Sequence, residues 1–381
     1  MNLGKLPKAP PHRPISTPEE QMRAARFYGG TDIRVETVSE PQPEEREVLV
    51  EVRATGICGS DLHGYHRQPE KPRSPTTGGH ELTGQVAGLG NGVCQHRIGD
   101  RVAVEPTVPC NDCPECLNGN YNLCSRLVHV GGSIGNRLGN VFSGGFAEYM
   151  VAPEGNVYEL PDKVSFEAGA MAEVYAVAVH ALSMAPVHPG DSVAVIGSGP
   201  VGLALAQMAQ LAGAASVAVL GKPDAPLQLA KESMGIVPIN VDTVDAVEAV
   251  RAWTDGRGAN VVFEAVGGRA QTLQQATQIA AVRGKICMVG GHTGALELDT
   301  RYARRRELTV MWSFCYGRRD GKREFQIALD LMAVGKLDPI PLITHRFPLD
   351  EIQRAFAVAD GRDEHGSVKV LVLPSNLQGE R

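Results

Sequence analysis

The sequence predicts an α/β protein that combines a doubly wound parallel sheet with a second, mostly β domain. Beyond His180, short apolar strands alternate with helical patterns, which is typical of βαβ units in a parallel sheet. From about residue 22 to residue 175, short strands such as EVLVEVRATG are broken by glycine and proline, which indicates β structure with long loops. A chain of 381 residues also suits two or three domains better than one core.

The bulk composition excludes several classes of protein. A formal net charge of −6 argues against a general nucleic-acid binder, which needs a basic face. No apolar run is long enough to predict a membrane span. Residues 1–21 are rich in proline and charge without a signal-peptide core, so we expect a disordered leader and a cytoplasmic protein. In that reducing compartment, clustered cysteines bind metal more often than they form disulfides.

Each element after His180 follows from its pattern. DSVAVIGSGPVG is typical of an apolar strand that enters a glycine turn, and apolar residues recur at helical spacing from Val201 onward. The next elements are, in order, a strand SVAVLG, a helix APLQLAKESM, a strand ANVVFEAVG, a helix from AQTLQQATQIAA and a strand GKICMVGG. After about Tyr316, the helical REFQIALDLMAVG and the strand SVKVLVL no longer fit this series and could return to the first domain.

The segment GSGPVG predicts a dinucleotide site of the Rossmann type. Gly197 allows a tight turn, Gly199 lets a pyrophosphate approach the backbone, and Gly202 lets the helix pack close to the strand. The spacing alone is weak evidence and fits a plain tight turn, but here a strand precedes it and a helix follows it, as the mechanism requires. We therefore expect Gly197, Gly199, Val201 and Gly202 to bind the cofactor.

The end of the next strand favours NADP over NAD. An enzyme that binds NAD usually places an acidic residue there to hold the ribose 2′-hydroxyl, but this chain has Gly221 followed by Lys222. No carboxylate would repel a 2′-phosphate, and a cation is adjacent. The alternative is that Lys222 is a solvated turn residue and that NAD binds without the acidic residue.

A cluster of four cysteines predicts a structural zinc site. Its members are Cys110, Cys113, Cys116 and Cys124. Their spacing, C-x2-C-x2-C-x7-C, differs from an iron–sulfur run in its last interval and lacks the following proline. Disulfide bonds are not expected in the reducing cytoplasm. A closed tetrathiolate zinc uses all four sulfurs and leaves no position for substrate. The remaining Cys94, Cys287 and Cys315 have no such spacing and are expected to pack as small apolar groups.

Two short segments contain residues that could bind a catalytic zinc. GICGSDLH contains Cys58, Ser60, Asp61 and His63, and GGHELTG contains His80 and Glu81. Each alone is unremarkable, because a lone cysteine or histidine is usually a buried packing residue. Together they supply thiolate, imidazole and carboxylate, which is the donor set of an open, catalytic zinc.

These motifs give the chain a close resemblance to a known family. GICGSDLH, GGHE, CNDCPECLNGNYNLC, GGFAEYMVAP and GSGPVG occur in the order found in zinc-dependent medium-chain dehydrogenases, and most resemble the polyol branch with sorbitol, butanediol and threonine dehydrogenases. The resemblance covers about residues 22–374. It implies a GroES-like catalytic domain over 22–178 and 317–381, with the structural-zinc lobe, and a Rossmann domain over 179–316.

The resemblance also implies roles for individual residues. Cys58 and His80 would bind the catalytic zinc, with Glu81 as a ligand or an exchangeable neighbour. Glu173 in AEVYAVAVH matches a glutamate that ligates zinc directly or through water, although relatives often continue with proline and leucine where this chain has Val174 and Tyr175. Alternatively, Glu173 only complements a helix N-terminus, and Glu81 only supports the ligands.

The resemblance further implies a supporting carboxylate and a proton relay in GICGSDLH. Asp61 would accept the free ring N–H of His80 and so fix its tautomer. Ser60 would take the alcohol proton and pass it by the cofactor ribose to His63 and solvent. The alternatives are an exposed loop aspartate, a turn serine and a surface histidine.

The resulting hypothesis is a zinc- and NAD(P)-dependent alcohol dehydrogenase that acts on a polyol, a sugar or a vicinal hydroxy compound. Its partners would be a small alcohol or ketone, neither nucleic acid nor membrane, and its own copies in a homodimer or homotetramer. A zinc-free reductase of quinones or activated alkenes and a non-catalytic NADP-binding protein are the rivals. Three aromatic residues would either line the substrate pocket or pack in the core, namely Tyr175, Phe314 and Tyr316. A run of four arginines would form either a solvated face or a subunit contact, namely Arg301, Arg304, Arg305 and Arg306.

Overall fold

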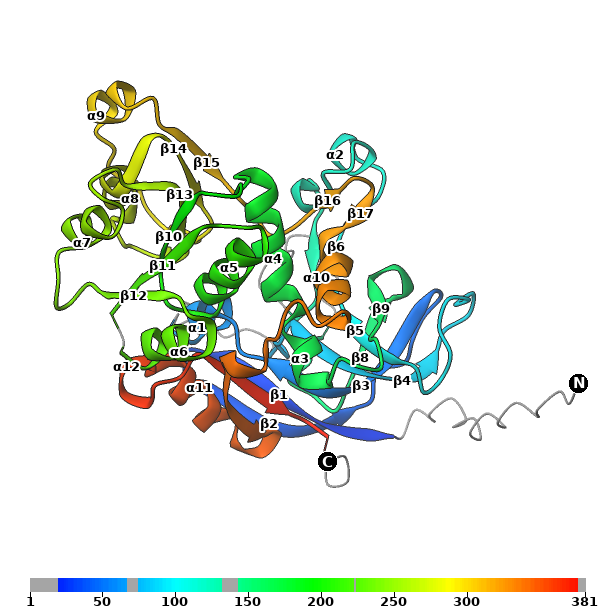
Figure 1. Cartoon of the computed structure of the whole chain (residues 1–381). Helices are drawn as coiled ribbons and strands as arrows, with labels where there is room; N and C mark the ends of the chain where they lie inside the picture. Colours follow the sequence, from blue (N-terminus) through cyan, green and yellow to red (C-terminus); the bar gives the residue numbers. More distant parts are fainter. Residues whose placement is uncertain (1–19, 67–74, 132–142, 223, 376–381) are drawn as a thin grey trace, which may run out of the picture.

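A computed structural model describes residues 20–66, 75–131, 143–222 and 224–375. The leader expected over residues 1–21 lies outside the described residues except at its last two positions, and Gln21 begins the first strand. Figure 1 shows two parts, a parallel sheet flanked by helices and a group of mostly antiparallel strands to which the C-terminal segment returns.

The predicted parallel sheet is confirmed and has six strands. In spatial order they are β12 (Val237–Asn240), β11 (Ser216–Gly221), β10 (Ser192–Ile196), β13 (Ala259–Glu264), β14 (Ala280–Met288) and β15 (Thr309–Trp312). All neighbours pair in parallel. The strand order therefore reverses between β10 and β13, which is the point where doubly wound sheets bind a ligand.

Helices cover both faces of this sheet because successive strand residues point to opposite sides. Val193 and Val195 of β10 pack with α4 (Ala172–Met184), α5 (Pro200–Leu211) and α6 (Asp224–Met234). Ala194 and Ile196 face α7 (Ala246–Trp253) and α8 (Thr272–Ile279). The central strands β10 and β11 are consequently apolar at every position after their first residue, as expected for a parallel sheet covered twice.

The second part contains a seven-stranded sheet. Its strands are β18 (Ile343–Pro348), β19 (Lys369–Leu373), β3 (Glu47–Gly56), β4 (Glu81–Leu89), β5 (Arg101–Val104), β9 (Val157–Glu159) and, beside β3, β8 (Tyr149–Pro153). Three two-stranded sheets complete it, formed by β1 (Gln21–Gly29) with β2 (Asp32–Ser39), β6 (Thr107–Val108) with β7 (Val128–His129), and β16 (Arg318–Arg319) with β17 (Lys322–Arg323). The remaining helices are α1 (Gly59–Tyr65), α2 (Pro114–Leu117), α3 (Phe166–Ala170), α9 (Thr300–Arg305), α10 (Glu324–Ala333), α11 (Ile352–Asp360) and α12 (Arg362–His365).

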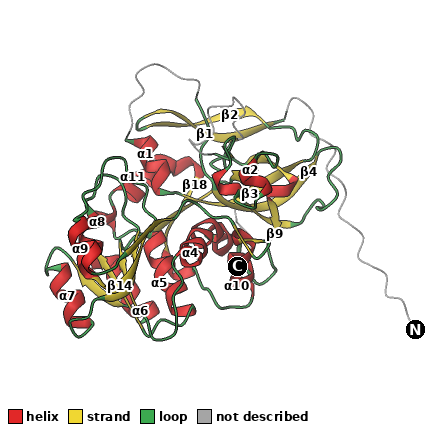
Figure 2. Cartoon of the chain, turned by 90° about the horizontal axis from the view of Figure 1, so that it is seen from above, coloured by secondary structure: helices red, strands yellow, loops and turns green. Residues whose placement is uncertain are grey.

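The end of the chain returns to the first domain, as its sequence pattern allowed. SVKVLVL forms β19, which pairs antiparallel with β3 through Leu371 and Gly56. The helix expected in REFQIALDLMAVG is α10, and it packs against α4 (Figure 2). The boundary expected between residues 178 and 179 falls inside α4, whose thirteen residues run without a break between the two parts.

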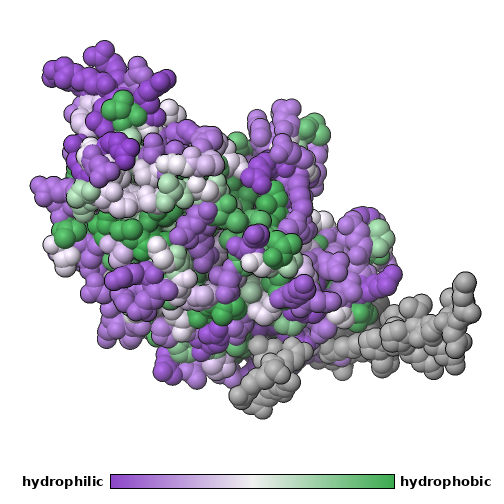
Figure 3. Space-filling view, viewed as in Figure 1, coloured by the Kyte–Doolittle hydropathy of each residue, from purple (hydrophilic) through white to green (hydrophobic). Residues whose placement is uncertain are grey.

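The surface in Figure 3 is mainly hydrophilic, with apolar residues gathered over the middle of the face. The projecting tip that carries α9 is hydrophilic, in agreement with the exposure of Arg301, Arg304 and Arg305. Arg306 differs because its guanidinium donates to Ala280 O and lies over the ring of Tyr302. Among the described residues, no helix is long and apolar enough to cross a membrane.

Candidate active site and metal centres

Cys58, His80 and Glu81 meet where two antiparallel strands end. Cys58 follows β3 and caps the start of α1. His80 immediately precedes β4 and Glu81 is its first residue, and β4 pairs with β3 so that Gly56 faces Glu81. One ligand atom of each of the three residues lies within 4.8 Å of the others. Residues that are 23 positions apart in sequence are therefore brought together by strand register alone.

Glu81 is held by a cation from the far end of the chain. Nζ of Lys369 donates to Oε2 of Glu81 at 2.5 Å and to Ile57 O at 3.1 Å, and both charged side chains are only 1% exposed. The carboxylate fits because residue 56 is glycine, since a Cβ atom there would lie 2.1 Å from Oε2 of Glu81. Glu81 is thus both a metal-ligand candidate and one half of a buried ion pair.

Asp61 lies behind His80, as expected, but without a hydrogen bond to it. Its Oδ1 is 3.6 Å from Nδ1 of His80, beyond hydrogen-bond range, while its Oδ2 accepts the N–H of Cys58 at 2.9 Å. Burial alone would lower the pKa of His80, but the charges of Asp61 and Cys58 outweigh burial and raise it well above its usual value. The site therefore favours positive charge on or beside this imidazole.

Glu173 lies in the first turn of α4, close to these residues but outside the group of three. Its side chain accepts no hydrogen bond from the residues that the structure describes, although it is only 9% exposed. Burial and the neighbouring Glu81 carboxylate raise the pKa of Glu173 to about 7. A second buried carboxylate beside the first is costly unless a cation neutralises the pair.

These observations show that the residues fit a zinc ion. The donor set is a thiol, an imidazole and carboxylates, which zinc prefers at open sites. Nδ1 of His80 is buried without a hydrogen-bond partner among the described residues, and the electrostatics around Glu173 and His80 favour an added cation. Cys58, His80 and Glu81 would hold the ion, with Glu173 nearby.

The two expected relay residues lie on one face of α1. Oγ of Ser60 is 3.4 Å from Nε2 of His80, and His63 follows three residues later. Both residues are exposed, as a path from the site to solvent requires.

The four clustered cysteines also converge. Their sulfurs lie within 4.8 Å of one another, with 3.4 Å between Cys113 and Cys116 and between Cys110 and Cys124. Backbone N–H groups of Cys116 and Ser125 lower the pKa of Cys113 to about 6 and so favour its thiolate. Four convergent sulfurs with no fifth position for substrate fit a closed structural zinc site.

A buried polar network connects the segment that carries the four cysteines, residues 110–124, to the rest of the protein. Tyr121, between Cys116 and Cys124, donates to Oε1 of Glu105 at 2.5 Å, and Tyr158 donates to Oε2 at 2.7 Å. Arg323 completes the network with an ion pair to the fully buried Glu105. The segment that carries the four cysteines is therefore connected through Tyr121 to a buried carboxylate that also binds Tyr158 and Arg323.

The glycine turn has the geometry that its sequence predicted. Gly197 has φ of +117°, and Gly199 caps α5 without a side-chain hydrogen bond. A Cβ atom on Gly202 would lie 1.9 Å from Gly197 O, so the close approach of helix and strand requires glycine. Val201 is half-buried in the first turn of α5.

The end of β11 has no room for the usual acidic residue. A Cβ atom on Gly221 would lie 2.2 Å from Oγ of Ser198, so a larger residue would collide with the glycine turn. Lys222 is exposed beside it, and its Nζ lies 3.6 Å from Oδ1 of Asp242.

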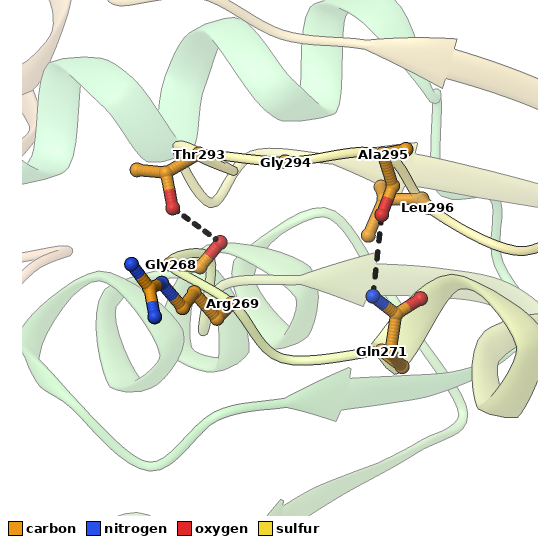
Figure 4. A pocket seen from close by; sticks show the side chains of 7 residues that line it. All are labelled: Gly268, Arg269, Gln271, Thr293, Gly294, Ala295 and Leu296. Carbon is orange, nitrogen blue, oxygen red and sulfur yellow. Dashed lines mark hydrogen bonds between the residues drawn. The ribbon is translucent and has the colours of Figure 1, made fainter.

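A shallow pocket lies at the same edge of the parallel sheet, between the loops that follow β13 and β14 (Figure 4). It is lined by Gly268, Arg269, Gln271, Thr293, Gly294, Ala295 and Leu296. Gln271 and Thr293 each donate to a backbone oxygen across it, so the two loops are tied together. The pocket is separate from both cysteine-containing clusters.

Sequence reasoning missed three residues around the site. Lys369 sits in a strand pattern that gave no sign of a charged contact. His129 of β7 is 6% exposed and packs edge-to-face on His80, with 5.3 Å between ring centroids. Arg362, discussed below, lies against the glycine turn. Tyr175 and Tyr316 are fully buried and pack in the core, whereas Phe314 is 45% exposed.

Comparisons with known proteins agree with this geometry. Residues 44–162 match the alcohol dehydrogenase GroES-like domain, and residues 200–334 match the zinc-binding dehydrogenase domain. The chain is 32% identical to sorbitol dehydrogenase of Bacillus subtilis over 94% of this chain and 99% of that protein.

Solved structures show the same likeness. The crystal structure of 2R,3R-butanediol dehydrogenase from Bacillus subtilis is 32% identical, with a TM-score of 0.81 and coverage of 93% of this chain and 100% of that one. A zinc-binding dehydrogenase from Sinorhizobium meliloti 1021, solved with NADP, is 32% identical with a TM-score of 0.83 and the same coverage. The metal-ligand cluster, the glycine turn and these matches together show that the chain belongs to the zinc-type medium-chain alcohol and polyol dehydrogenases.

Proposed function

We propose that the chain oxidises a secondary hydroxyl group of a polyol, a sugar or a vicinal hydroxy compound, or reduces the matching ketone. Members of its family are oxidoreductases that transfer hydride between NAD(P) and a secondary alcohol. The observation that carries the proposal is the convergence of Cys58, His80 and Glu81 in one cluster, in which His80 and Glu81 are buried and Cys58 is half-buried. The polyol class is supported by the sorbitol and butanediol dehydrogenases among its relatives.

The chain's own residues supply binding and proton transfer. The overall reaction converts the alcohol and NAD(P)⁺ into the ketone, NAD(P)H and one proton. Zinc bound at this cluster would supply Lewis acidity, which lowers the pKa of an alcohol. Ser60 is proposed to accept the alcohol proton and His63 to release it to solvent. A Ser60→Ala variant should lose about 10²- to 10⁴-fold in kcat, and an unchanged kcat would refute the relay.

Two finer assignments belong to the same proposal. The four-cysteine cluster would hold a second, structural zinc. The cofactor would be NADP rather than NAD, which Lys222 and the lack of an acidic residue at position 221 support. A homodimer or homotetramer and a cytoplasmic location stay expectations from the resemblance and the sequence; light scattering and cell fractionation test them.

A substrate screen tests the function directly. Zinc-loaded protein is offered polyols, sugars, amino-cyclitols and simple secondary alcohols with each cofactor, and formation of reduced nicotinamide is followed. We expect the highest kcat/KM for a compound with neighbouring hydroxyl groups. A preference for simple secondary alcohols would refute the polyol class, and turnover of quinones or activated alkenes alone would favour the zinc-free reductase.

A further inference from the structure

Arg362 reaches from the C-terminal segment onto the glycine turn of the parallel-sheet domain. It is the first residue of α12, which follows α11 and precedes β19. A Cβ atom on Gly199 would lie 2.8 Å from Nη1 of Arg362, so the guanidinium packs directly against the backbone at the start of α5. In Figure 1, α12 lies close to α6, between the two parts of the molecule.

This guanidinium has almost no partners of its own. Among the described residues, its one hydrogen bond runs from Nε to Ala359 O at 3.4 Å, and neither Nη group donates to a side chain. The nearby Asp360 is engaged elsewhere, since its Oδ1 lies 2.7 Å from Nε2 of His66. Burial lowers the pKa of Arg362 even though Cys58, Glu81 and two aspartates oppose that effect. Arg362 is therefore a half-buried cation with no carboxylate hydrogen-bonded to it among the described residues.

The guanidinium faces a second positive group. The first N–H groups of α5 have no intrahelical partners, and Gly199 provides no side-chain cap. The helix dipole adds partial positive charge at the same end. Two positive groups held together in a half-buried position repel each other unless an anion lies between them.

We propose that Arg362 binds the pyrophosphate of the dinucleotide cofactor, opposite the N-terminus of α5. The pyrophosphate of a Rossmann cofactor lies at this turn, and a guanidinium fork matches phosphate oxygens in pairs. The inference rests on the proposed dinucleotide site. Because Arg362 belongs to the segment that also carries Lys369, bound cofactor links the nucleotide domain to the part that holds Cys58 and Glu81.

Binding of cofactor fragments tests this role without turnover. Calorimetry is carried out on the full-length protein with ADP-ribose, which contains the pyrophosphate, and with adenosine, which contains no phosphate. Arg362→Gln should bind ADP-ribose about 10- to 100-fold more weakly, the loss typical of a hydrogen bond to a charged group, and Arg362→Lys should lose less. Both variants should bind adenosine like the wild type. Arg354→Gln removes an exposed arginine of the preceding helix and is the matched control.

Each contrary result has a distinct meaning. Unchanged ADP-ribose affinity in Arg362→Gln overturns the proposal, and so does an equal loss for adenosine, which would show a structural effect on the whole site. Thermal unfolding of the variants identifies a folding defect, and the lysine variant then decides, because it keeps the charge at this position. A wild-type protein that binds neither ligand would refute the dinucleotide site itself.

Discussion

Lys369 and Glu81 form a fully buried ion pair at the edge of the proposed catalytic site, with 2.5 Å between Nζ and Oε2. Lys369 is the first residue of β19, which joins the sheet through β3, so the C-terminal strand delivers the cation to a carboxylate that lies 288 positions earlier. The pair fixes the orientation of Glu81 beside Cys58 and His80. It also ties the shape of the site to docking of the C-terminal strand.

Removal of the lysine charge should strongly destabilise the protein. In the zinc-free protein, Lys369→Met leaves the Glu81 carboxylate buried without its partner, a change that costs about 3–5 kcal/mol in other proteins. Urea unfolding measures it, with the exposed Lys336→Met as control. Glu81→Gln combined with Lys369→Met should recover part of the loss, because no unpaired charge remains. Equal stability of Lys369→Met and Lys336→Met would show that the pair contributes little.

Loss of one of the four clustered cysteines should remove one metal ion and make the protein less stable. Cys113→Ser takes a ligand from a closed site, so we expect one zinc fewer per chain and a lower melting temperature. Cys94→Ser is the control because Cys94 is exposed and outside both clusters. Metal analysis and thermal unfolding measure the two effects. A full zinc complement in Cys113→Ser would contradict the assignment of the cluster.

Lys222 should set the cofactor preference. Lys222→Ala removes the cation that we place near the 2′-phosphate, so kcat/KM with NADP should fall while kcat/KM with NAD stays nearly constant. Lys231→Ala, in the helix that follows, is the control for a general loss of positive charge. If the wild type strongly prefers NAD, or if both cofactors suffer equally, Lys222 has no part in recognising the phosphate.

Glu324 should make stability depend on pH below neutrality. Burial would raise the pKa of Glu324, but hydrogen bonds from His180, Ser183 and the N–H of Gly317 outweigh it and hold the pKa below its usual value. A carboxyl with a lowered folded pKa stabilises the fold above its unfolded pKa, and this contribution disappears as pH falls through the folded pKa.

The corresponding experiment compares Glu324→Gln with the wild type. At pH 7 the variant should be less stable by roughly 1–3 kcal/mol, and the gap should narrow as pH falls below about 4.5. Urea unfolding across this range measures it, with the exposed Glu351→Gln as control. If the difference in free energy of unfolding between the two proteins stays constant over the whole acidic range, the ionised form of Glu324 does not stabilise the packing of α4 against α10.

The sequence predicted the features that depend on local pattern. Apolar strands, the glycine turn and the cysteine spacing are short-range signals, and all three appear in the structure as expected. Strands β12 and β15 were not identified because each has only four residues and a weak pattern.

Contacts between distant segments gave no sequence signal. A lysine at position 369 looks like any charged residue in a strand, and only the register of β19 on β3 places it at Glu81. Arg362 and His129 reach the site through loops and tertiary packing in the same way. The hydrogen bond expected between Asp61 and His80 is absent, since Oδ1 of Asp61 lies 3.6 Å from Nδ1 of His80 while its Oδ2 accepts the N–H of Cys58.

The central claim is that Cys58, His80 and Glu81 hold the zinc that hydride transfer requires. The most direct test measures zinc content, NAD(P)H formation and ADP-ribose affinity together in Cys58→Ala. We predict one zinc per chain instead of two, retained at the four cysteines, with loss of turnover and wild-type ADP-ribose affinity. Turnover at the wild-type rate in this variant would contradict the account.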